Sequence, residues 1–310
     1  MRIISDIPAD LRSAAAAIGN FDGVHLGHQA IINQAEQQAQ ALGAPLGIVT
    51  FEPHPRAFFA PEAEAFRLMD AAARASRLEK LGVEVLYEIP FTQELANLSS
   101  QSFVEDVLKD GLGLAHAVVG QDFRFGQKRA GDASQLQKLC HANDIGATVA
   151  PLIALGPDEV SSTAIRAALS AGNPKHAAEM LGHWHRIEGE ILHGDKRGRE
   201  LGYPTANMSL KGRHLPKFGV YAVKIDVLDG PHQGTYQGAS SIGVRPMFGE
   251  NSPNCETYIF DFEGNLYGSQ VSVALVDYLR GEEKFDWLPA LITQMDADCA
   301  RAREILADVG

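Results

Sequence analysis

The sequence has little cysteine: three residues in 310, Cys140, Cys255 and Cys299. An odd number of widely spaced cysteines indicates neither a disulfide framework nor a Cys-x-x-Cys metal site, and we expect a reducing, cytoplasmic location. No apolar run reaches the length of a membrane-spanning helix, so we expect no membrane partner.

Basic residues are fewer than acidic ones, with 27 Lys and Arg against 39 Asp and Glu and a formal net charge of -12. Nucleic-acid binding needs a basic footprint, so we expect no nucleic-acid partner.

The chain does have the apolar content of a globular protein, with 45% hydrophobic and 21% charged residues. Its length is sufficient for one large domain or two ordinary ones, each with its own core. Because the net charge is negative, any bound nucleotide must be held by local hydrogen-bond donors and metal ions.

Strand-like and helix-like segments alternate in the first half of the chain, which predicts a parallel sheet with helices on both faces. In such sheets ligands bind beyond the carboxyl ends of the strands, so the loops that follow strands are the candidate site. The expected strands are residues 14–18, 46–51, 83–88, 115–120 and 147–152, and the expected helices are 29–42, 70–82, 99–110 and 132–143.

The pattern changes after Gly182, following a helical stretch that breaks at residues 171–174. Apolar residues alternate with polar ones between Tyr221 and Val227, which indicates strands with one buried face. We therefore predict domains at 1–181 and 182–310, the second a small antiparallel β-barrel. Its expected strands are 186–192, 221–227, 236–242, 256–262 and 271–278, and a terminal helix at 286–306 would pack on it through Leu288, Leu291, Ile292, Met295, Ala302 and Ile305.

The most distinctive motif is Gly-Asn-Phe-Asp-Gly-Val-His-Leu-Gly-His-Gln at residues 19–29. It lies between a predicted strand and a predicted helix, and His25 and His28 flank a glycine at the helix start. A helix N-terminus favours an anion, and two imidazole donors there would suit a phosphate that gains charge during reaction. Two surface histidines at a helix cap are the simpler alternative, and a zinc site is another, although no third ligand is spaced for it.

Three further loops follow predicted strands. In Thr-Phe-Glu-Pro-His-Pro, residues 50–55, prolines constrain His54, although a rigid turn would look the same. Residues 120–132 hold two phenylalanines and three cations between glycines, which suits a planar ring beside an anionic group because surface loops rarely expose two phenylalanines. In Ser-Ser-Thr-Ala-Ile-Arg, residues 161–166, the hydroxyls are good helix caps, and Arg166 could reach a triphosphate.

One stretch of the second half also has the composition of a phosphate-binding loop. Residues 193–207 interleave three glycines, Gly194, Gly198 and Gly202, with cations, which suits either a polyphosphate or a flexible basic hairpin. At its end, Thr205 and Asn207 lie two residues apart, on the same side of an extended chain. Hard oxygen ligands of this kind suit Mg²⁺.

The four motifs of the first half occur in the order in which they occur in bacterial bifunctional riboflavin kinase/FAD synthetase (FMN adenylyltransferase), a family that the chain resembles from about residue 14 to 306. The resemblance implies a Rossmann-like nucleotidyltransferase domain followed by a kinase barrel. It implies that His25, His28 and Arg166 are catalytic toward ATP. The implied ATP contacts also include Gly19, Phe21, Gly27, Ser162 and Thr163, and the implied flavin contacts are His54, Asp122, Phe123, Arg124 and Phe125.

In the second half, Gly-Tyr-Pro-Thr-Ala-Asn at residues 202–207 resembles the riboflavin kinase motif. This implies Mg-ATP held by Thr205 and Asn207 under a loop containing Gly194, Gly198 and Gly202. The family's glutamate base corresponds to Glu256. Two departures are Met247, where the family usually has threonine, and Tyr258, where it often has histidine.

The resemblance implies two reactions. Riboflavin and ATP give FMN in the C-terminal domain, and FMN and ATP give FAD and pyrophosphate in the N-terminal domain, with Mg²⁺ as cofactor and flavoenzymes as possible clients. Two alternatives stay open: only one activity is retained, or the chain is a flavin-binding storage protein without turnover. Intact His25, His28 and Glu256 argue against storage, because storage needs neither phosphate donors nor a base.

Overall fold

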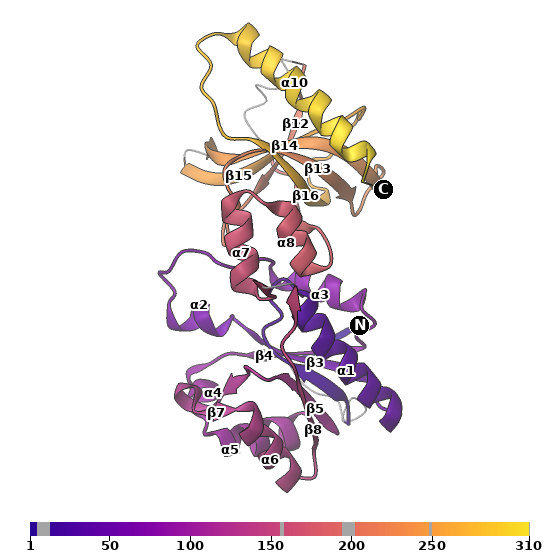
Figure 1. The fold of residues 1–310 in the computed structure, drawn as a ribbon, viewed down its shortest axis with the longest axis vertical. Helices are drawn as coiled ribbons and strands as arrows, with labels where there is room; N and C mark the ends of the chain where they lie inside the picture. Colours follow the sequence, from indigo (N-terminus) through magenta and orange to yellow (C-terminus); the bar gives the residue numbers. More distant parts are fainter. Residues whose placement is uncertain (5–12, 156–157, 194–201, 248–249, 310) are drawn as a thin grey trace. The chain divides into compact units, whose positions relative to one another are not determined.

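The computed structural model describes residues 1–4, 13–155, 158–193, 202–247 and 250–309 (Figure 1). The chain divides into two compact units. The first comprises Met1–Ala63 and Ala71–Ser161, and the second Glu64–Asp70 and Ser162–Gly310. This is a division by packing, and the boundary after residue 181 stays a prediction of where two activities divide.

The first unit contains a parallel sheet with strand order β1-β4-β3-β2-β5-β8. Its central strands are buried on both faces, as expected of apolar runs in a parallel sheet. One face packs on helical residues such as Phe103, Leu108 and Leu136. The strands are β1 (Arg2–Ile4), β2 (Ala15–Ile18), β3 (Leu46–Glu52), β4 (Val85–Pro90), β5 (His116–Gly120) and β8 (Gly146–Ala150).

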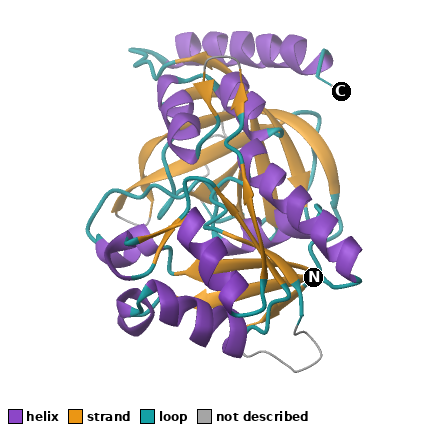
Figure 2. Ribbon diagram, turned by 60° about the horizontal axis from the view of Figure 1, so that its bottom comes forward, coloured by secondary structure: helices purple, strands orange, loops and turns teal. Residues whose placement is uncertain are grey.

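The helices of the first unit lie on both faces of this sheet, which confirms the predicted parallel architecture (Figures 1 and 2). The main ones are α1 (Leu26–Leu42), α3 (Ala71–Glu79), α5 (Ser100–Ser102) with the π-helix Phe103–Gly111, and α6 (Ala133–Ala142). Short elements fill the loops: α2 (Pro55–Phe59), α4 (Gln93–Asn97), the 3-10 turn Gln127–Arg129, and the two-residue strands β6 (Arg124–Phe125), β7 (Gly131–Asp132), β9 (Ala154–Leu155) and β10 (Asp158–Glu159).

Several predictions for the elements of the first unit are wrong: the strand predicted at 83–88 is Val85–Pro90, the helix predicted at 70–82 is Ala71–Glu79, and three more differ. The first helix begins at Leu26 rather than residue 29, because the imidazole of His25 caps it. The helix predicted at 99–110 is mostly π-helix, which the spacing of apolar residues does not distinguish from α-helix. The last strand ends at Ala150, two residues before the predicted end.

The second unit contains an antiparallel sheet with strand order β11-β16-β13-β14-β15-β12. An antiparallel bridge between Leu192 and Asn207 joins its two ends, so the sheet curls into the predicted barrel (Figure 2). Its interior includes Ile187, Val223 and Leu275. The elements are β11 (His185–Glu190), β12 (Thr205–Ser209), β13 (Gly219–Val227), β14 (Gly234–Met247), β15 (Glu250–Ile259), β16 (Gln270–Arg280), α7 (Ser162–Ala171), α8 (Pro174–Leu181) and α10 (Leu288–Ala307).

The terminal helix α10 packs on the outer face of the barrel through Ala302 and Leu306. The predicted apolar face is wrong at its other end, where Leu288 is 51% exposed, because the buried contacts of α10 belong to its C-terminal half. The sequence also failed to predict β12, a short strand with three polar residues in five. Within the described ranges, no helix combines the length and apolar character needed to cross a bilayer.

Candidate active sites

The loop after β2 is held in an unusual backbone conformation. Phe21 and Val24 have φ angles of 51° and 44°, which are left-handed values rare for side chains other than glycine, and rarest for a β-branched one. Such strain costs on the order of 1–3 kcal/mol per residue and persists where surrounding contacts impose it. Here the Val24 carbonyl accepts from Gln29 Nε2 at 2.8 Å, and the Phe21 ring is fully buried. The loop therefore presents a fixed backbone ahead of α1.

His25 caps α1 with its own side chain. Its Nδ1 accepts the backbone N–H of His28 at 3.3 Å, so the neutral ring carries its proton on Nε2. A side chain at Gly27 would begin 3.1 Å from the His25 ring, which explains the glycine between the two histidines.

The rings of His25 and His28 stack, with centroids 3.6 Å apart and planes 19° apart. Burial, and then the neighbouring His25, hold the pKa of His28 well below its ordinary value. His28 Nδ1 is buried and has no hydrogen-bond partner among the described residues. The structure therefore brings two stacked imidazoles together at the positive end of a helix, with burial favouring the neutral form of His28, and this arrangement suits an anionic group.

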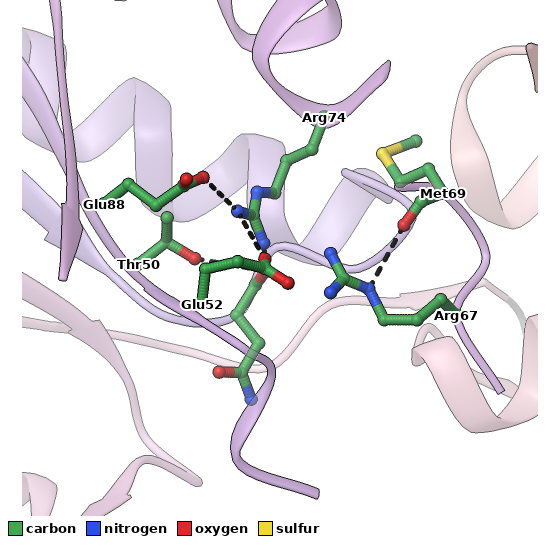
Figure 3. A network of polar contacts seen from close by, with 7 residues as sticks. Thr50, Glu52, Arg67, Met69, Arg74 and Glu88 are labelled. Carbon is green, nitrogen blue, oxygen red and sulfur yellow. Dashed lines mark hydrogen bonds and ion pairs between the residues drawn. The ribbon is translucent and has the colours of Figure 1, made fainter. Parts of the chain in front are cut away.

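An ion-pair network that the sequence reading missed lies at the carboxyl ends of β3 and β4 (Figure 3). The Arg74 side chain is 0% exposed, and its Nη2 contacts Glu88 at 2.7 Å and Glu52 at 3.1 Å. Its Nη1 also lies 3.5 Å from the carbonyl of Asn20, in the loop after β2. In the sequence, this network could have been found from the position of Arg74, a cation on the same face of α3 as the buried residues Ala75 and Leu78.

The other predicted residues of the first unit differ in exposure. His54 Nδ1 accepts the Arg56 N–H at 3.0 Å, so His54 caps α2. The expectation of two exposed phenylalanines is wrong for Phe125, which is 6% exposed because it packs on Phe103 in the core. Phe123 is half-buried and stacks on Phe125 with centroids 5.7 Å apart, while Asp122 and Arg124 are exposed. Gly19 lies directly after β2.

Ser162, Thr163 and Arg166 lie in the first turns of α7, in the second unit. Arg166 donates from Nη2 to Thr163 Oγ1 at 3.3 Å and from Nη1 to the Phe66 carbonyl at 3.4 Å. The guanidinium also lies 5.8 Å from the centroid of the Phe66 ring. That these residues complete the site of His25 and His28 stays a prediction.

In the barrel, β12 pairs with β15 so that Asn207 lies opposite Glu256 and Thr205 opposite Tyr258. Directly opposed residues share a face, and this face is the outer one, since Met208 and Cys255 point into the core. Asn207 is 7% exposed and donates from Nδ2 to the Thr205 carbonyl at 3.2 Å, which turns its Oδ1 away from that carbonyl. The structure thus brings the predicted oxygen ligands and the predicted base together.

Two further residues shape this face, and sequence reasoning missed them. Asn254, 1% exposed, donates from Nδ2 to Glu256 Oε1 at 3.1 Å and so orients the carboxylate. The Tyr203 hydroxyl donates to Asp296 of α10, and the Tyr203 ring meets Tyr258 edge-on at 5.0 Å. A polar residue two positions before the glutamate in a strand was the signal for Asn254, because alternate residues share a face.

The remaining predicted residues of the barrel are described in part. Gly202 has a φ of 84°, a left-handed value that favours glycine. Gly194 and Gly198 lie outside the described residues, and of Met247 only the backbone, at the end of β14, is described. Over the ranges that the structure describes, no three His, Cys, Asp or Glu side chains cluster as metal ligands.

Comparison with known proteins addresses both halves. A sequence model of the FAD synthetase family matches residues 7–164, and one of the riboflavin kinase family matches residues 181–306. A bifunctional riboflavin kinase/FMN adenylyltransferase of Pseudomonas fluorescens is 41% identical over 99% of this chain and 97% of its own. The chain belongs to the bifunctional riboflavin kinase/FMN adenylyltransferase family.

Another relative of the same name, from Listeria monocytogenes, is 36% identical over 94% of this chain and 92% of its own. A crystal structure described as a macrolide-efflux protein from Streptococcus pneumoniae is 30% identical, with a TM-score of 0.83 over 100% of this chain and 99% of its own. The likeness to bifunctional riboflavin kinase/FMN adenylyltransferases therefore covers both halves, and the predicted fold class is confirmed.

Proposed function

We propose that this chain, a transferase of FAD biosynthesis, divides its two reactions between residues 182–310, which phosphorylate riboflavin, and residues 1–181, which adenylylate FMN. The observation that carries the proposal is the contrast between the sites. One has two stacked imidazoles at a helix N-terminus, and the other has a carboxylate beside two oxygen ligands.

For adenylyl transfer, a phosphate oxygen of FMN attacks the α-phosphorus of ATP, the bond to the bridging oxygen breaks, and pyrophosphate leaves. A phosphate monoester is already anionic near neutral pH, so no general base is needed. The N–H groups of His25 and His28 would donate to ATP oxygens, and the positive end of α1 would favour the negative charge. Arg166 would hold the triphosphate, with Ser162 and Thr163 at the start of α7.

For riboflavin phosphorylation, the terminal ribityl hydroxyl attacks the γ-phosphorus of ATP and ADP leaves. An alcohol must lose its proton, and Glu256, oriented by Asn254, would accept it. Thr205 and Asn207 would hold Mg²⁺, and their hard oxygen atoms on one face of β12 fit that ion. Mg²⁺ bound with ATP neutralises phosphate charge.

The flavin of the adenylylation step would lie by His54, Asp122, Phe123 and Arg124, with Phe125 supporting Phe123 from the core. Flavoenzymes that take up the product are the proposed clients, and the cytoplasm is the proposed location.

The test is chromatography of flavins, sampled over time after riboflavin, ATP and Mg²⁺ are mixed with the purified protein. FMN should rise first and then give way to FAD. Accumulation of FMN alone would mean that the first site is inactive, and conversion only of added FMN would mean that the barrel is inactive. Unchanged flavin with no ATP consumption would overturn the enzymatic proposal in favour of storage.

A further inference from the structure

A histidine of the riboflavin kinase region holds the backbone of Arg166. His214 follows β12 and lies inside the stretch matched by the riboflavin kinase family, residues 181–306. Its Nε2 is 3.0 Å from the Arg166 carbonyl and 3.2 Å from Ser170 Oγ, both on α7. A carbonyl can only accept, so Nε2 carries the ring proton and donates it to Arg166.

The backbone around His214 also contacts the segment that carries Phe66, the residue beside the Arg166 guanidinium. The His214 N–H donates to the Arg67 carbonyl at 2.8 Å, and Arg67 forms a parallel bridge with Arg213. Arg213 Nη2 also forms an ion pair with Asp70 Oδ2 at 2.5 Å. The segment Glu64–Asp70 contains Phe66, against which the Arg166 guanidinium lies. This segment is therefore held next to the residues around His214.

The charge state of His214 suits this role. Burial lowers the pKa of His214. The hydrogen bond to the Arg166 carbonyl acts in the opposite direction, and the positive charge of Arg166 again lowers the pKa. The imidazole is therefore neutral near pH 7, keeps its Nε2 proton for the carbonyl, and adds no repulsion to the neighbouring guanidinium.

We propose that the side chain of His214 is a positioning residue for adenylyl transfer, fixing the backbone of Arg166 through Nε2, while the backbone N–H of His214 holds the segment that carries Phe66. The inference rests on the proposed role of Arg166 toward ATP. It assigns a residue of the kinase region to the other reaction, so one substitution in the barrel should alter FAD formation and leave FMN formation intact.

The experiment measures kcat and KM for ATP in FMN adenylylation and in riboflavin phosphorylation, each with its own flavin substrate, on the full chain. His214→Ala should lower kcat/KM for FAD formation about five- to tenfold, chiefly through KM, since one hydrogen bond is lost. FMN formation should stay within about twofold of wild type, because the hydrogen bonds of the His214 side chain go to Arg166 and Ser170 rather than to the residues proposed for phosphorylation. His214→Gln, which keeps a donor at similar reach, should recover most of the loss, and His232→Ala is the matched control.

A double-mutant cycle with Arg166→Ala separates positioning from general stability. If His214 acts through Arg166, His214→Ala should add nothing in the Arg166→Ala background. An independent loss there, an equal loss of both activities, or no loss in the single variant would overturn the inference. If His214→Ala does not fold, His214→Leu fills the space without a donor and must show the same selective loss. FAD formation unchanged by Arg166→Ala would instead overturn the proposed role of Arg166.

Discussion

The two candidate sites are encoded differently in the chain. His25 and His28 are neighbours in sequence, and one helix start places both rings. Asn207 and Glu256 come from different strands, and only the register between β12 and β15 brings them together. Local geometry therefore controls the first site, whereas pairing across a sheet controls the second. A substitution in either should be felt at that site alone, and the predictions below test this separation.

The largest expected effect is on the barrel. Glu256→Gln keeps the hydrogen bond available from Asn254 but removes the base, so FMN formation should fall about 10²- to 10⁴-fold. Conversion of supplied FMN to FAD should continue at the wild-type rate. Steady-state rates with riboflavin and with FMN, measured on the same preparation, check this. A loss in both reactions would argue against two separate sites.

The converse prediction concerns the first site, at the start of α1. His28→Ala removes one donor at the end of α1 and should lower FAD formation about 10²- to 10³-fold while FMN formation persists. His141→Ala, on an exposed position of α6, is the control and should leave both rates unchanged. FAD formation retained in His28→Ala would mean that the stacked pair is only a helix cap.

A smaller effect is expected from the ion pairs beneath the loop after β2. Arg74→Met leaves Glu52 and Glu88 without their cation, and because both carboxylates are partly exposed the loss should be about 2–3 kcal/mol of unfolding free energy. Denaturant unfolding measures it, with Lys80→Met on the exposed surface as control. An unchanged midpoint would show that water replaces the guanidinium at no cost.

The smallest effect concerns acid stability of the barrel. Burial first, and then His183, His214 and Arg213, lower the pKa of His185 from its ordinary 6.5 to about 3. Below about pH 6.5 His185 is protonated in the unfolded chain but stays neutral in the folded one. The contribution of His185 to the free energy of unfolding is therefore complete above about pH 6.5 and falls by up to about 1.4 kcal/mol per pH unit below it.

His185→Gln cannot titrate and should flatten this loss between pH 7 and pH 5, as measured by denaturant unfolding at each pH. His141→Gln should keep the wild-type slope. If His185→Gln lost stability as steeply as wild type, a group other than His185 would be responsible for the acid sensitivity.

The same contrast explains what the sequence could predict. The order of strands and helices in the first unit follows from apolar periodicity, and the motif around His25 and His28 is contiguous, so both were accessible. The pairing of Asn207 with Glu256 depends on a five-residue strand whose polar composition hid it, and on a register that no local pattern specifies. The resemblance named both residues, but sequence alone could not place them face to face.

Long-range polar contacts were equally inaccessible. Arg74, on α3, meets glutamates from two strands, and its helical spacing shows only that a cation lies on a buried face. Phe125 was expected at a surface because its loop is rich in glycine and cations. Its burial is decided by Phe103, from a helix earlier in the chain.

The segment Glu64–Asp70 has a consequence for how the protein could be cut. Because it belongs to the second unit while its flanks belong to the first, the chain passes between the units at residues 63/64, 70/71 and 161/162. A single nick at 161/162 would leave the two fragments joined by the Arg67–Arg213 bridge and the Arg213–Asp70 ion pair. A clean separation into two polypeptides would therefore require residues 64–70 to leave their contacts within the second unit.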